Sequence, residues 1–352
     1  MDGLLLALVG FVCGMLAGGA AQYGRLCTIG AIEDALVAGD LRRARAWALA
    51  AGVALLLTQV LVLSGSLDLS ATHHAQPRLD LSGLIAGGLL FGLGAALVGT
   101  CAFGMLVRAG TGDLRAMVSA LILGLAAFAA TGGILSDIRS RITYLAVIDM
   151  SPLGGKTLTG IAATFLGSAA AWACALGIAG TLLAFGLVSG RLYRRPRLLA
   201  AACTIGLAVA AGWTATGVLG DPFGGQAPES LSFVAPLARV ILQVMGESLA
   251  TTGFAVATVF GVAAGSFAAA ALRDELRWEA FDDAREMRRH LLGAVLMGIG
   301  GVLARGCTIG QGLSGTSTLS LAAPIAVLAM VAGARLGLSH LIEGRMLFVR
   351  RQ

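Results

Sequence analysis

The sequence predicts an all-α, polytopic membrane protein with about nine transmembrane helices and additional short re-entrant helices. Of its 352 residues, 57% are hydrophobic and only 12% are charged, whereas soluble proteins carry about 25% charged residues. The mean hydropathy is +0.87. The apolar residues are gathered in runs of about 20, the length that crosses a bilayer as a helix. We therefore expect a single integral membrane domain over residues 1–352.

The expected spans are the runs 3–22, 46–66, 82–100, 114–132, 158–188, 198–219, 250–271, 290–305 and 319–338. A further apolar segment, 231–246, is interrupted by Pro236 and Arg239, so we interpret it as re-entrant or interfacial, although it remains a candidate span. The longest polar stretch, 272–290, is too short to form a soluble domain.

Basic residues between the spans indicate how the protein is oriented. Loops on the cytoplasmic side of membrane proteins are enriched in Lys and Arg. With nine spans, most arginines fall on one side, among them Arg42, Arg43, Arg194 and Arg195. This predicts an outer N-terminus and an inner C-terminus. The net charge of +6 does not indicate nucleic-acid binding, because the basic residues show no aromatic interleaving.

Glycines mark two kinds of position inside the apolar runs. Gly14 with Gly18, and Gly261 with Gly265, form G-x-x-x-G patterns typical of closely packed helices. The stretches FGLGAALVGTCAFG (91–104) and MGIGGVLARGCTIG (297–310) align without gaps and indicate a duplicated unit. Because the two stretches should run in opposite directions, they predict an inverted repeat of the kind that brings broken helices together at a transport site. The expected halves are 1–135 and 198–340, joined by 136–197.

A helix that ends inside a bilayer leaves backbone polar groups unpaired unless protein or a polar cavity satisfies them. Glycine gives the backbone freedom that such a break requires, and threonine and glutamine side chains could act as donors to an anion in it. The residues that we expect to line the breaks and to contact a substrate are Gly99, Thr100, Gly104, Gly306, Thr308, Gly310 and Gln311.

Three of the six cysteines are candidates for function. Cys27, Cys101 and Cys307 each begin a C-x-x-G sequence and each have an arginine nearby. Arg25 and Arg305 could attract anions, because a charge at membrane depth is costly unless it serves a pathway or a partner. We expect packing roles for Cys13 and Cys174, whereas the role of Cys203, in a second ACTIG sequence, stays open.

The spacing of the thiols disfavours several chemistries. The cysteines form no CxxC or CxC pair, so neither a disulfide scaffold nor a zinc site is predicted, and we expect no metal or other cofactor. What remains is a thiol used as a weak hydrogen-bond donor to a sulfur-containing anion. The alternatives are a membrane thiol enzyme that exchanges sulfane sulfur or electrons with a carrier protein, and a permease for soft metals.

Three stretches of the chain, GRLCTIGAIED (24–34), GLGAALVGTCAFG (92–104) and GIGGVLARGCTIGQGLSG (298–315), resemble the YeeE/YedE family of bacterial inner-membrane proteins, whose characterised members take up thiosulfate. The resemblance implies an hourglass of helices pinched at Cys27, Cys101 and Cys307, which would pass thiosulfate by transient S–H···S contacts. It also implies a small cytosolic sulfur carrier of the TusA type as partner. With the orientation predicted from the arginines, the N-terminus would be periplasmic and the C-terminus cytoplasmic. Another sulfur or selenium compound remains an alternative substrate, and the protein would be a transporter rather than an enzyme.

Overall fold

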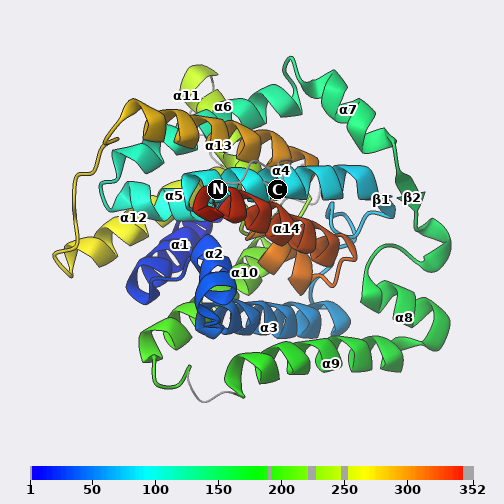
Figure 1. Ribbon diagram of the computed structural model, residues 1–352. Helices are drawn as coiled ribbons and strands as arrows, with labels where there is room; N and C mark the ends of the chain where they lie inside the picture. The colour runs from blue at the N-terminus through cyan, green and yellow to red at the C-terminus, as the bar shows by residue number, and fades with distance from the viewer. Residues whose placement is uncertain (1, 189–191, 221–226, 247–252, 344–352) are drawn as a thin grey trace.

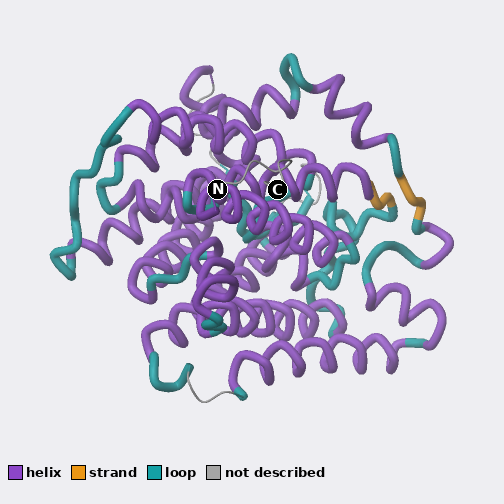
Figure 2. The backbone as a smooth tube through the Cα atoms, viewed as in Figure 1, coloured by secondary structure: helices purple, strands orange, loops and turns teal. Residues whose placement is uncertain are grey.

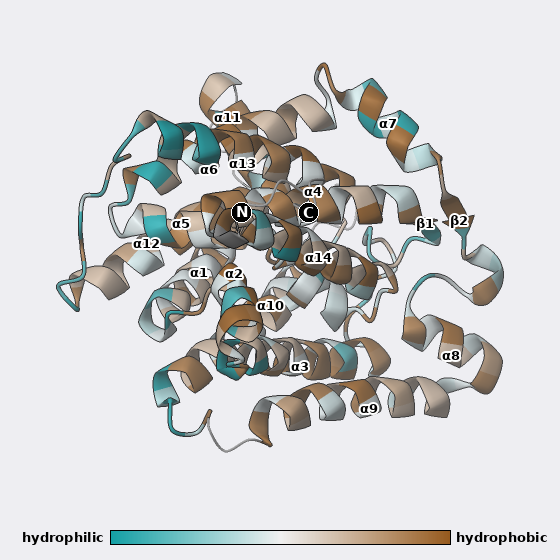
Figure 3. Cartoon of the chain, in the orientation of Figure 1, coloured by the Kyte–Doolittle hydropathy of each residue, from teal (hydrophilic) through white to brown (hydrophobic). Residues whose placement is uncertain are grey.

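Long apolar helices make up most of the computed structural model, which describes residues 2–188, 192–220, 227–246 and 253–343 (Figures 1 and 2). The helices are α1 (Asp2–Gly24), α2 (Thr28–Glu33), α3 (Arg42–Leu63), α4 (Leu81–Val98), α5 (Ala102–Gly110), α6 (Leu114–Thr131), α7 (Ser136–Tyr144), α8 (Leu158–Leu166), α9 (Ser168–Leu187), α10 (Pro196–Val218), α11 (Val234–Gly246), α12 (Phe254–Ala271), α13 (Ala284–Leu303) and α14 (Ala322–Glu343). Two short strands are β1 (Arg78–Asp80) and β2 (Val147–Asp149). Hydrophobic residues cover the long helices, and hydrophilic ones gather at the connections (Figure 3).

The polytopic helical fold class is confirmed. Within the described ranges, eight helices are long and apolar enough to cross a membrane. The one predicted span that is missing from these eight, 290–305, falls mostly within α13, which is 20 residues long. Its first turns carry Arg285, Glu286, Arg288 and Arg289, so only its second half is uniformly apolar.

One predicted span is wrong in its extent. The run 158–188 does not form a single helix but divides into α8 and α9, which fold back on each other at Gly167 (Figure 1). Gly167 has φ 86° and ψ 176°, a backbone conformation that is essentially restricted to glycine. The run is also longer than a bilayer requires, and α9 alone has 20 residues, about the length of one span.

The segment 231–246 forms the short helix α11. Its 13 residues extend about 20 Å at 1.5 Å per residue, which is less than the about 30 Å of a hydrocarbon core. The re-entrant or interfacial interpretation therefore agrees with its length. Pro236 lies in the first turn, where a missing backbone N–H costs little.

The G-x-x-x-G patterns form one seam between α1 and α12. Gly14 faces the Thr258 backbone and Gly18 faces the Val262 backbone, so that a Cβ at either glycine would overlap a carbonyl oxygen. Because the paired residue numbers rise together, the two helices run parallel. The predicted close packing is confirmed, and it follows the rule that small residues let helices approach in a membrane.

The helices that precede Cys101 and Cys307, α4 and α13, pack against each other. Gly87 packs on Gly300 and Ala304, whereas Gly94 packs on Gly293. The paired numbers run in opposite directions, so α4 and α13 are antiparallel, as the span count predicts. Helix α14 packs parallel to α4 on another side, with further glycine contacts.

A small sheet that the sequence analysis did not predict joins two connections at one end of the bundle, at the right of Figure 1. β1 pairs antiparallel with β2, with Arg78 opposite Asp149 and Asp80 opposite Val147. Strands of three residues carry too little periodicity to be recognised in a sequence. The sheet places Asp80 at the start of α4.

Candidate functional site

Cys27, Cys101 and Cys307 occupy equivalent places in the chain. Each follows the end of a long helix, namely α1, α4 or α13, and stands at the start of a short helical segment. Two residues before each cysteine, the backbone turns left-handed, at Arg25 (φ 52°), Gly99 (φ 79°) and Arg305 (φ 54°). That conformation costs a non-glycine residue roughly 1–2 kcal/mol. The same break is thus built three times.

The C-x-x-G pattern is a helix-capping arrangement. The Cys27 Sγ accepts a hydrogen bond from the Gly30 amide at 3.5 Å, and the Cys307 Sγ accepts one from the Gly310 amide at 3.4 Å. Cys101 is the N-cap of α5 with an extended backbone. In that unit the glycine serves packing, because a Cβ at Gly104 would overlap the Thr100 hydroxyl.

Threonine hydroxyls from other segments surround the thiols. Cys27 Sγ lies 4.0 Å from the Thr100 hydroxyl, and Cys101 Sγ lies 3.8 Å from the Thr28 hydroxyl. The Thr308 hydroxyl also lies near Cys101. The sequence analysis did not select Thr28, although the shared CTIG letters give Thr28 and Thr308 equivalent places.

The three thiols lie in one buried region. Cys101 is 1% exposed and Cys307 is 0% exposed, whereas Cys27 is half-buried. Cys101 is close enough to both other thiols for electrostatic interaction. An apolar cavity of about 130 Å³ lies beside them, and Thr28 and Thr308 form part of its lining. Cys13, Cys174 and Cys203 instead lie within the long helices α1, α9 and α10.

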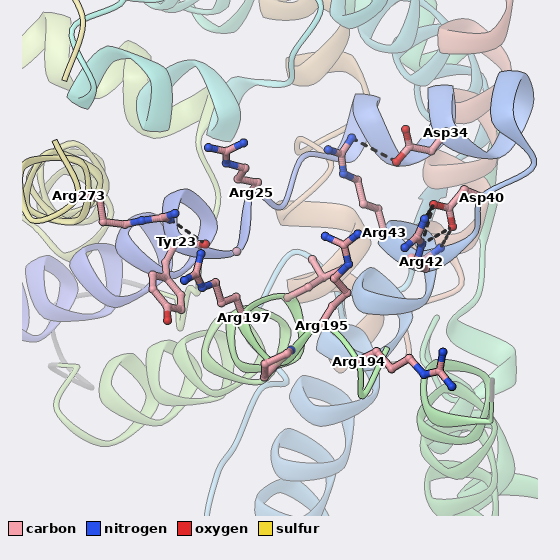
Figure 4. Close-up of a pocket in the computed structure, with 13 residues that line it drawn as sticks. Tyr23, Arg25, Asp34, Asp40, Arg42, Arg43, Arg194, Arg195, Arg197 and Arg273 are labelled. Atoms are coloured by element: carbon pink, nitrogen blue, oxygen red, sulfur yellow. Dashed lines mark hydrogen bonds and ion pairs between the residues drawn. The ribbon is translucent and has the colours of Figure 1, made fainter. Parts of the chain in front are cut away.

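Arg25, two residues before Cys27, lines a large basic pocket at the start of α3, which we call the arginine mouth (Figure 4). It has a volume of about 670 Å³. Its lining contains seven arginines and two aspartates: Arg25, Arg42, Arg43, Arg194, Arg195, Arg197, Arg273, Asp34 and Asp40. In Figure 4, the side chains of Arg25, Arg43 and Arg195 reach around one open space.

Several ion pairs shape the arginine mouth without neutralising it. Arg25 pairs with Glu275 at 3.1 Å, and Arg43 pairs with Asp34 at 3.2 Å. The Arg25 side chain is 72% exposed, so its pair is weak and screened by salt. With arginines in excess of acids along the lining, the pocket attracts anions.

Arg305, two residues before Cys307, lines a small pocket where α3 ends and α4 begins, which we call the Asp80 pocket. Its volume is about 10 Å³, and its polar lining is His73, His74, Arg78, Asp80, Lys156, Arg305 and Gln311. Arg305 forms an ion pair with Asp80, which is 5% exposed. The Gln311 amide nitrogen donates to the carbonyls of Ala304 (2.8 Å) and Arg305 (3.2 Å), which closes the end of α13.

The structure thus separates the two arginines that the sequence analysis grouped as anion attractors. Arg25 lines the arginine mouth and Arg305 lines the Asp80 pocket, each two residues from a cysteine of the buried region. Lys156 and His74, which the sequence analysis did not select, line the same pocket as Arg305. No local motif marks them, because they reach the pocket through tertiary packing.

Comparison with known proteins places this arrangement in a family. A family model described as sulphur transport matches residues 23–336. A thiosulfate transporter of Escherichia coli is 27% identical over 352 residues, covering 93% of this chain and 92% of that protein. A thiosulfate transporter of Spirochaeta thermophila is 27% identical over 337 residues, covering 92% and 96% respectively. The family model spans all three cysteines and both arginines, and the chain belongs to the sulphur transport family.

Proposed function

We propose that this protein is a transporter of the bacterial inner membrane that moves thiosulfate, or a related reduced-sulfur anion, past Cys27, Cys101 and Cys307. The observation that carries the proposal is the arrangement of three buried thiols, two of which follow arginines that line separate pockets. The names of the two relatives support thiosulfate as the substrate.

The thiols suit the passage of an anion because they bind it weakly. Burying a charge without a partner is prohibitively costly, so the path must supply donors. Thiol S–H groups are weak donors and hydroxyls are stronger ones, and Thr28, Thr100 and Thr308 accompany the cysteines. Such a set compensates part of the lost hydration and still allows release, the balance that conduction requires.

An enzymatic role of the thiols has less support. A nucleophilic cysteine needs a nearby base or a lowered pKa. In the described part of the chain, the hydrogen-bond partners of these cysteines are threonine hydroxyls and backbone amides. Transport therefore accounts for the site better than sulfur or electron exchange does.

The orientation follows from the arginine mouth. Arginine-rich connections favour the cytoplasmic side, so the mouth would face the cytoplasm and the Asp80 pocket the periplasm. The N-terminus would then be periplasmic and the C-terminus cytoplasmic. A small TusA-like carrier protein would take up the sulfur anion at the mouth, and the basic lining supports docking of an acidic surface there.

Uptake of labelled thiosulfate into proteoliposomes tests the proposal. Cys101→Ala and Cys307→Ala should each lower the uptake rate by about tenfold or more, which corresponds to about 1.4 kcal/mol in the barrier. Cys174→Ala, in α9 and away from the breaks, is the matched control and should transport normally. Wild-type rates in both Cys101→Ala and Cys307→Ala would refute the relay of thiols.

A further inference from the structure

Two cations share one carboxylate in the Asp80 pocket. Lys156 is 2% exposed and Asp80 is 5% exposed, and both line the pocket together with Arg305. The three residues come from separate parts of the chain: Asp80 from β1, Lys156 from the connection before α8, and Arg305 from the break after α13. Arg305 takes the carboxylate as its ion-pair partner.

Lys156 is held in place by backbone contacts. Its carbonyl accepts a hydrogen bond from the Leu321 amide at 2.9 Å, next to a bridge between Thr157 and Ser320. Its Nζ donates to the carbonyls of His73 and Arg78. These partners are neutral, so the positive charge of Lys156 stays uncompensated by direct contact. The Asp80 carboxylate acts on Lys156 from nearby but is paired with Arg305. Lys156 therefore has only part of a counter-charge, and a bound anion would add to it.

His74 adds a polar group without a partner. Its side chain is 3% exposed and lines the same pocket, and its Nδ1 has no hydrogen-bond partner among the described residues. Burial, together with His73, Lys156 and Arg305 nearby, holds the pKa of His74 well below its usual value. The imidazole is therefore neutral at physiological pH and can donate one N–H to a ligand.

The pocket has little free space in this structure. Its volume of about 10 Å³ accommodates about one water molecule, whereas the arginine mouth measures about 670 Å³. The Asp80 carboxylate is the anion nearest to Arg305 and fills the place where another anion would bind. An arriving anion must therefore displace it.

We propose that Lys156 and Arg305 form a binding site for a small divalent oxyanion, with His74 as an additional donor, and that Asp80 occupies Arg305 until the anion displaces it. The site deepens the proposed function, on which it rests for the identity of the anion as thiosulfate. Two cations in one pocket match two negative charges. Asp80 then serves as an internal competitor that keeps the pocket shut when the anion is absent.

Binding and uptake measured on the purified full-length protein test this site. The probe is sodium thiosulfate at constant ionic strength, with binding followed by thermal stabilisation in detergent and KM by uptake into proteoliposomes. Lys156→Met should raise Kd and KM by about tenfold or more, since tenfold corresponds to 1.4 kcal/mol. Asp80→Asn should lower both severalfold, because the competing charge is gone. Lys156→Arg should stay near wild type.

Arg141→Met is the control, because it removes an exposed charge from α7 at the same end of the molecule and should leave Kd unchanged. An unchanged Kd in Lys156→Met, or a raised Kd in Asp80→Asn, would overturn the site. If Lys156→Met does not fold, the direction in which Kd changes in Asp80→Asn decides whether the site exists. A wild-type protein that binds thiosulfate but does not carry it would refute the proposed function and leave the site standing.

Discussion

The segments of Cys27 and Cys101 each place a threonine hydroxyl beside the thiol of the other segment. Thr28 follows Cys27 but contacts Cys101, whereas Thr100 precedes Cys101 and lies near Cys27. This exchange ties α2 to the break before α5. The hydroxyls also give a passing anion donors that are stronger than the thiols themselves.

Thr28→Val tests the hydroxyl at nearly constant volume. Uptake should slow severalfold, because the anion loses a donor beside Cys101. The free energy of unfolding should change by less than about 1.5 kcal/mol, the upper range for a single neutral hydrogen bond. Thr28→Ser, which restores the hydroxyl, should recover the rate; equal rates in the valine and serine variants would contradict this role.

The pH dependence of uptake follows from Lys156. Burial, followed by the charge of Arg305, lowers the pKa of this lysine to about 8. The groups that face it are His73, His74, Arg78, Asp80 and Arg305. As the pH rises through about 8, Lys156 loses the charge that would bind the anion, so kcat/KM for uptake should fall. Below about pH 8, Lys156 stays charged, so this residue should cause no change in kcat/KM.

Lys156→Arg provides the matched measurement, because arginine stays charged throughout the accessible range. The alkaline decline in kcat/KM should disappear in this variant. The same decline in both proteins would assign it to another group.

At this scale, the sequence predicted the functional residues only where a local pattern marks them. Cys27, Cys101 and Cys307 stand out through C-x-x-G, a local pattern that in the units of Cys27 and Cys307 forms a helix cap. Lys156 and His74 are single residues in polar connections. Lys156 is held against Leu321, and His74 lies against Trp213 and near Arg305. Contacts with residues so far along the chain cannot be recognised from the neighbouring sequence.

At the scale of elements, glycine has two separate tasks. In α1 and α12 it allows two backbones to touch, and at Gly99 and Gly167 it allows the chain to turn. The first task repeats every four residues and is visible in the sequence. The second needs only one residue, which explains why the break between α8 and α9 was not predicted whereas the seam was.

Gly18→Leu should destabilise the protein, because the new side chain would overlap the Val262 backbone, which cannot move aside. Overpacking usually costs 1–3 kcal/mol, and a backbone contact should lie at or above about 3 kcal/mol. Gly3→Leu, in the same helix but with no atom within 4 Å of the new Cβ, is the control. Thermal unfolding of the two purified variants should differ clearly, and equal stabilities would contradict the seam.

At the scale of the whole molecule, the structure has a wide pocket at the arginine mouth and little free space at the Asp80 pocket. Cys27 is half-buried next to the mouth, whereas Cys101 and Cys307 are almost completely buried. The volumes of about 670 Å³ and about 10 Å³ describe the same asymmetry. In the proposed orientation, this is a state that faces the cytoplasm.

Labelling with a membrane-impermeant thiol reagent should reveal this state. In protein lacking Cys13, Cys174 and Cys203, reagent supplied from the side of the mouth should modify Cys27 first. Reagent from the other side should react slowly until thiosulfate is added, because the anion would open the Asp80 pocket. Equal labelling of Cys27 from both sides without thiosulfate would contradict the closed pocket.

Arginine stands close to a thiol at both ends of the path, as Arg25 at the mouth and as Arg305 in the Asp80 pocket. An anion therefore meets a favourable potential from either side. Attraction of the same sign at both ends gives no preferred direction of travel. Net flow would be decided by the difference in concentration and by the reactions that consume the anion after release, and a reversed gradient would send it back.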